Sequence, residues 1–143
     1  MKKLNIIYWS GTGNTEKMAE LILEGAKGVD NLEAQMIDVS SASKKDVEEC
    51  DLIALGCPSM GDEVLEEGEM EPFMESIEGS LSGKKIALFG SYGWGDGKWM
   101  RDWEERMNNC GGDLVDDGLI VNGEPSGDAV DQCKGLGKLL AES

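Results

Sequence analysis

Short, continuous apolar runs alternate along this chain with longer segments in which apolar residues recur at helical spacing. The clearest runs cover residues 4–9, 52–56, 86–90 and 119–121. Strands that are apolar throughout are covered on both faces, as in parallel sheets. Each run is followed by a helical pattern, which is typical of strand–helix–strand units. The alternation therefore predicts an α/β fold, a doubly wound five-stranded parallel sheet with helices on both faces.

The segments between these runs supply the other elements. Apolar residues at helical spacing predict helices at residues 16–26, 44–50, 72–77, 98–109 and 130–142. Segment 33–39 alternates apolar and polar residues, which predicts a more exposed strand. The 143 residues contain no internal repeat and no linker-like stretch. We therefore expect a single domain over residues 1–143.

The charge balance excludes several classes of partner. The chain carries 13 Lys and Arg against 29 Asp and Glu, a net charge of −16. Such a surface disfavours nucleic acid and anionic lipid as partners and favours a basic protein or a cationic ligand. The chain has no histidine, which removes Ser-His and Cys-His catalysis and histidine metal ligands.

Cysteine spacing and hydropathy bear on compartment. No two of the four cysteines form a Cys-x-x-Cys pair, so we expect free structural thiols and no metal site. The apolar run after Lys2 and Lys3 is too short for a signal peptide. No stretch reaches the roughly 20 apolar residues of a membrane span. We expect a cytoplasmic protein without a membrane partner.

Ligands of doubly wound sheets bind beyond the carboxyl ends of the strands, so the loops there carry the functional signal. The first loop follows Trp9 and is rich in glycine and hydroxyl groups. Backbone N–H groups at a helix start can bind phosphate together with such hydroxyls. No Gly-Lys-Ser/Thr follows, and Glu16 stands where a dinucleotide-binding pattern requires its third glycine. The alternative is an ordinary strand-to-helix turn.

Two further loops lie at the same edge of the predicted sheet. Trp94 is flanked by glycines, so its indole either stacks on a flat ligand or folds back onto the helix that starts near Lys98. Between Lys45 and Lys84 the chain has twelve Asp and Glu and no basic residue. Part of this acidic run is a solvated face, but part of it adjoins the expected ligand mouth.

Together the three loops resemble those of flavodoxins, most closely the short-chain flavodoxins of anaerobic clostridia and their relatives. The resemblance covers the chain to about residue 141, with the loops in the same order and spacing. Flavodoxins have strand order 2-1-3-4-5 and bind FMN where that order reverses, so the resemblance implies both here. The matching motifs are Ser10-Gly11-Thr12-Gly13-Asn14-Thr15, Met60-Gly61-Asp62-Glu63 and Ser91-Tyr92-Gly93-Trp94-Gly95.

The resemblance also implies a role for each matching position. The first motif would hold the FMN phosphate, approached past Pro58 and Ser59. Trp94 and Met60 would lie against the two faces of the flavin ring. The Gly61–Asp62 peptide would lie at flavin N5, and Glu63 at the N3 edge. The remaining candidates are the loop residues Ser91, Tyr92, Gly93 and Gly95, and Asn122, which is followed by the side-chainless Gly123.

The function implied is that of a low-potential one-electron carrier with non-covalently bound FMN, and not that of an enzyme. Its partners would be redox proteins with basic docking surfaces, and the chain would act as a monomer. A flavoenzyme such as a quinone or nitro reductase would need a substrate pocket over the flavin and usually a dimer. A response-regulator module would carry an acidic pair after the first strand, where this chain has Ser10-Gly11.

Overall fold

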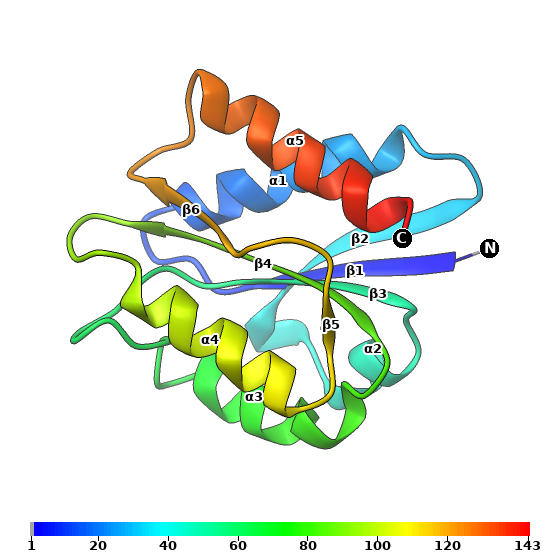
Figure 1. Cartoon of the computed structure of the whole chain (residues 1–143), viewed down its shortest axis with the longest axis horizontal. Helices are drawn as coiled ribbons and strands as arrows, with labels where there is room; N and C mark the ends of the chain where they lie inside the picture. Colours follow the sequence, from blue (N-terminus) through cyan, green and yellow to red (C-terminus); the bar gives the residue numbers. More distant parts are fainter. Residues whose placement is uncertain (1) are drawn as a thin grey trace.

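The sheet is parallel and its strand order reverses next to the first strand. A computed structural model describes residues 2–143, with the strands in the order β2-β1-β3-β4-β5 and β6 also paired with β4 (Figure 1). The predicted α/β class and strand order are confirmed. The strands are β1 (Lys2–Tyr8), β2 (Leu32–Asp38), β3 (Leu52–Gly56), β4 (Lys85–Tyr92), β5 (Asp113–Leu114) and β6 (Leu119–Asn122).

The fifth position of the sheet is shared by two short strands. β5 pairs with Lys85 and Ile86 at the start of β4, and β6 pairs with residues 89–92 at its end. The sequence predicts only the second piece, because β5 has two residues, one of them charged, and gives no apolar run. The sheet therefore presents the carboxyl end of β6 beside that of β4.

The helices form one layer on each face of the sheet (Figure 1). α1 (Asn14–Lys27) and α5 (Asp128–Ala141) pack with Leu4 and Ile6 in one apolar cluster. The other face is covered by α2 (Lys44–Glu48), α3 (Met70–Ile77) and α4 (Lys98–Asn109), with the 3-10 turns η1 (Val39–Ser41) and η2 (Glu78–Ser80) between elements. Within residues 2–143, no helix is long and apolar enough to span a membrane.

The four cysteines are free, as predicted. Cys57 directly follows β3 and is fully buried, and this burial raises the pKa of its thiol to about 12. Burial likewise raises the pKa of Cys50 to about 11. Thiols with raised pKa values are poor nucleophiles at neutral pH, which agrees with a structural role.

Helices α1 and α5 touch each other through backbone, and glycines permit the contact. A Cβ on Gly25 of α1 would lie 2.0 Å from the Lys134 carbonyl oxygen, and one on Gly137 of α5 would lie 2.0 Å from the Ile22 carbonyl oxygen. No real Cβ tolerates such distances, so each helix seats a glycine against the other's backbone. This close contact holds α1, the helix that follows the first loop, against α5.

Gly137→Ala should destabilise the protein by about 1–3 kcal/mol, since the added methyl forces two backbones apart. Gly135→Ala on the same helix is the matched control, because a Cβ there meets no described residue within 4 Å. It should stabilise by about 0.5–1 kcal/mol through helix propensity. Urea unfolding of both variants measures the difference, and equal effects would contradict the close packing.

Candidate functional site

Four loops meet at the carboxyl edge of the sheet, because hydrogen bonding between strands continues beyond the strand ends. The Trp9 N–H donates to the Gly56 carbonyl at 3.0 Å, and the Ser59 N–H donates to the Ser91 carbonyl at 3.1 Å. The Gly123 N–H donates to the Tyr92 carbonyl at 2.9 Å. The loops after β1, β3, β4 and β6 are thus held to one another by backbone bonds.

The first loop leads into helix α1, and hydroxyl groups of the loop accept two of the first N–H groups of that helix. Gly13, the residue before α1, has φ +97° and no side chain of its own to cap the helix. The Ser10 hydroxyl accepts the N–H groups of Gly13 at 3.1 Å and Glu16 at 3.2 Å. Lys17, the nearest cation in sequence, is paired with Glu124. Whatever binds here meets hydroxyl and backbone groups instead of a charged side chain.

A pocket of about 280 Å³ opens between these loops. Its walls combine backbone of the first loop with apolar side chains. Ser59 lines the pocket, and its hydroxyl oxygen is one of two buried side-chain polar atoms without a hydrogen-bond partner in the described chain, the other being Nε1 of Trp103 on α4. The lining residues are Trp9, Gly11, Thr12, Asn14, Pro58, Ser59, Met60, Ser91, Tyr92, Gly93 and Gly123.

Nine of these eleven residues belong to the set predicted from sequence. The motifs do not include Trp9 or Gly123. The signal for Trp9 is the two-residue period of β1, in which Ile7 and Trp9 share the face opposite to Ile6. That period places the indole at the strand end, against the loop, and not in the sheet interior.

The remaining predicted residues lie around the pocket and do not line it. Thr15 is buried, and its hydroxyl accepts the Ser91 N–H at 3.3 Å, which ties the first loop to the end of β4. Asn122 lies beside Tyr92 in the sheet and is exposed. Trp94 is 57% exposed, so much of its indole surface is available for stacking. The others are Ser10, Gly13, Gly61, Asp62, Glu63 and Gly95.

A tight turn at residues 60–64 forms the opposite lip of the pocket. The backbones of Met60 and Val64 exchange two N–H···O bonds of 2.9 Å. The turn between them contains two residues in the left-handed region, Gly61 at φ +49° and Glu63 at φ +57°. For a non-glycine residue such a conformation costs free energy and persists where other contacts impose it.

The Glu63 carboxylate supplies that constraint. Its Oε1 accepts the N–H groups of Gly97 at 3.1 Å and Lys98 at 3.0 Å, which open helix α4. A carboxylate at a helix N-terminus also interacts favourably with the helix dipole. The turn after β3 and the loop after β4 are therefore joined, and Oε2 of Glu63 has no part in this bond.

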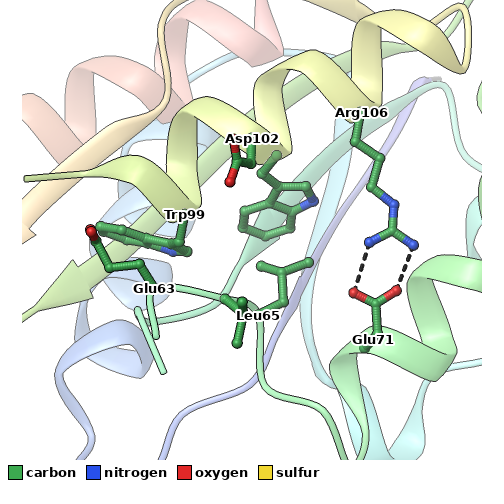
Figure 2. A pocket seen from close by; sticks show the side chains of 8 residues that line it. Glu63, Leu65, Glu71, Trp99, Asp102 and Arg106 are labelled. Atoms are coloured by element: carbon green, nitrogen blue, oxygen red, sulfur yellow. Dashed lines mark hydrogen bonds and ion pairs between the residues drawn. The ribbon is translucent and has the colours of Figure 1, made fainter. Parts of the chain in front are cut away.

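A second, smaller hollow of about 140 Å³ lies behind the turn, between it and α4. Figure 2 shows Glu63 at one end of this hollow and the paired side chains of Arg106 and Glu71 at the other. Arg106 donates to both oxygens of Glu71, at 2.9 and 2.7 Å, and to Glu78 at 3.1 Å. This network fastens α4 to α3. A cavity of about 150 Å³ accommodates one benzene-sized molecule, so this hollow is too small for a fused three-ring system.

Comparisons with known proteins agree on one family. The Flavodoxin family model matches residues 6–135. The flavodoxin of Clostridium beijerinckii is 55% identical over 140 residues, covering 96% of this chain and 99% of the relative. The flavodoxin of Megasphaera elsdenii is 42% identical over 140 residues, covering 98% of this chain and 99% of the relative.

A solved structure gives the same result. The solution structure of two-electron reduced Megasphaera elsdenii flavodoxin superposes with a TM-score of 0.88 at 40% identity, covering 98% of this chain and 99% of that one. The matches span essentially the whole chain, so the family assignment does not depend on one loop. The chain belongs to the flavodoxin family, whose members are FMN-containing, low-potential electron-transfer proteins and not enzymes.

Proposed function

We propose that this chain carries single electrons between redox proteins with FMN held in the pocket at the carboxyl edge of the sheet. The observation that supports this best is the Ser59 hydroxyl, buried in the pocket with no partner in the described chain. A buried hydroxyl without a hydrogen bond is costly, so a ligand with polar groups is expected there. FMN supplies one-electron redox chemistry when bound.

The residues present fit the two unlike ends of FMN. Hydroxyl and N–H groups of the first loop suit the phosphate, because they donate hydrogen bonds at a helix N-terminus. We assign this end to Ser10, Gly11, Thr12, Gly13, Asn14 and Thr15, with Pro58 and Ser59 beside them.

Apolar and aromatic groups on the other side suit the ring. Met60 and Tyr92 line the pocket, and the exposed Trp94 is free to stack. Oε2 of Glu63 is the group left to meet the ring edge, since Oε1 is held by α4. We assign the ring to Met60, Gly61, Asp62, Glu63, Tyr92, Gly93, Trp94 and Gly95, with Ser91 and Asn122 supporting the loops.

Redox proteins are the partners of this family, and the charge distribution supports basic docking surfaces on them. A cavity of about 400 Å³ next to Met60 is lined by Asp62, Glu66 and Glu67. These carboxylates stand at the pocket lip, where they would attract positive charge and orient a partner toward the flavin. We propose that the chain works as a single-domain monomer in the cytoplasm.

Titration of the apoprotein with FMN, followed by quenching of flavin fluorescence, tests the proposal. One equivalent of FMN should bind tightly and FAD much more weakly, because the first loop is short and has no cation to bind a second phosphate. Failure to bind FMN, or equal binding of FAD, would overturn the assignment of the pocket.

Trp94→Ala should weaken FMN binding by about 1–3 kcal/mol, the loss expected for one aromatic ring stacked on a flat heterocycle. Trp94 is exposed, so the apoprotein should unfold at the same urea concentration as the parent. Trp94→Phe is the control and should keep most of the affinity. Unchanged binding by the alanine variant would remove Trp94 from the site.

Gly61→Val should weaken FMN binding by about 1–2 kcal/mol, because a β-branched residue resists the left-handed conformation at φ +49°. No described residue lies within 4 Å of a Cβ placed there, so the effect is conformational and not steric. Gly61→Asn is the control, since asparagine tolerates this region. Equal losses in both variants would show that the turn does not depend on backbone conformation.

Neutralising Asp62 and Glu67 should raise the midpoint potential of the bound flavin. Carboxylates oppose the addition of negative charge nearby, and one at about 10 Å contributes roughly 20–70 mV before screening. Both residues are exposed and form no hydrogen bond or ion pair with a described residue. Potentiometric titration of Asp62→Asn/Glu67→Gln measures the shift.

Glu33→Gln is the control for this charge effect, because Glu33 lies near the amino end of β2, at the opposite edge of the sheet. It should leave the potential nearly unchanged. Added salt should raise the parent's potential by screening the carboxylates. If neither the double variant nor added salt changes the midpoint potential, Asp62 and Glu67 contribute only to solubility.

A further inference from the structure

Trp9 forms part of the pocket wall, although it lies outside the three sequence motifs. It follows β1 directly, is half-buried, and packs against the apolar cluster of the α3–α4 face. It lines the pocket together with Gly11 of the first loop and Met60 of the turn after β3. The indole therefore lies between the end assigned to the phosphate and the end assigned to the ring.

The indole also touches the backbone of the first loop. A Cβ on Gly11 would lie 3.0 Å from Cη2 and 3.2 Å from Cζ3 of Trp9. The six-membered part of the ring is thus in contact with the first glycine of the loop. A rotation of the indole would change both the pocket wall and the space that this loop occupies.

One polar bond fixes the orientation of the ring. The indole Nε1–H donates to Oε1 of Glu69 at 3.2 Å, across 60 residues of sequence. Tryptophan has a single side-chain N–H, so this is the only side-chain hydrogen bond that Trp9 can donate. Glu69 is the last residue of the loop between β3 and α3, residues 57–69, which we call the acidic loop, and the bond joins that loop to the pocket wall.

Glu69 is itself held in place. Its N–H donates to Oε1 of Glu66 at 2.6 Å, and the same carboxylate accepts the N–H groups of Gly68 at 2.8 Å and Met70 at 2.9 Å. Partial burial tends to raise the pKa of Glu66, but these three N–H groups outweigh it and lower that pKa. Met70 is fully buried, so the acceptor for Trp9 is anchored to the core at the start of α3.

We propose that Trp9 contacts the bound FMN and that Glu69 is its positioning residue, so that the bond between them tightens cofactor binding. The inference depends on the proposed function, since it deepens the same site. The acidic loop then has two separate roles. Glu69 orients the indole from within the fold, while Asp62 and Glu67 present free charge to the outside.

A double-mutant cycle on the FMN dissociation constant tests this, with Trp9→Phe, Glu69→Ala and the double variant titrated as apoproteins. Each single change should weaken binding about three- to tenfold, the range of one hydrogen bond. The double variant should bind FMN no more weakly than the weaker-binding of the two single variants, because both changes remove the same hydrogen bond. Urea unfolding of each apoprotein is recorded in parallel.

Two further variants separate the bond from the charge. Glu69→Gln keeps an oxygen acceptor for the indole and should bind FMN at least as tightly as the parent. Glu75→Ala removes an exposed carboxylate from helix α3 without touching Trp9, and it should cause no loss. If Trp9→Phe fails to fold, the difference in FMN affinity between Glu69→Gln and Glu69→Ala is sufficient to test the proposal.

Additive effects in the cycle, equal losses for glutamine and alanine at position 69, or unchanged affinity would each overturn the proposal. A loss of apoprotein stability with unchanged FMN affinity would likewise overturn it, by showing a purely structural pair. Failure of the parent itself to bind FMN is a separate result, which refutes the proposed function and not merely the role of Trp9.

Discussion

The parallel hydrogen-bond ladder is the interaction on which the rest of this molecule depends. Because all the strands run the same way, every chemically informative loop emerges at one edge. The ladder does not stop at the last strand residue: bonds from Trp9 to Gly56 and from Ser59 to Ser91 carry it into the loops. The pocket is therefore an extension of the sheet, and backbone hydrogen bonds of the same kind hold its walls in place.

Binding through neutral groups is the second theme of the site. In a protein of net charge −16, an unpaired lysine at the first loop would add affinity for any anion, but Lys17 is paired with Glu124. On the assignment proposed above, selection for phosphate would depend on the geometry of backbone N–H groups and hydroxyls. A site built this way keeps the surroundings of a redox centre free of positive charge, which suits a low-potential carrier.

Sequence alone predicts the elements whose signals are local. The bounds of β3 and α4 are predicted to the residue, because a continuous apolar run and a helical stripe each stop near glycine. β5 is missed because two residues carry no periodicity. The bond from Trp9 to Glu69 and the anchoring of Glu63 on α4 are missed for another reason. Both join residues more than 30 positions apart, and nothing in either segment indicates its partner.

The glycine contact between α1 and α5 has a consequence for how the chain can be shortened or extended. The loop assigned to the phosphate stands on α1, and α1 is seated by the backbone of the last helix. The carboxyl-terminal helix thus acts as a distant support for the cofactor loop, although it contributes no group to the pocket. A fusion attached after Ser143 keeps both glycine contacts, whereas a chain that ends before Gly137 lacks the contact with the Ile22 carbonyl and keeps less of the support under the loop.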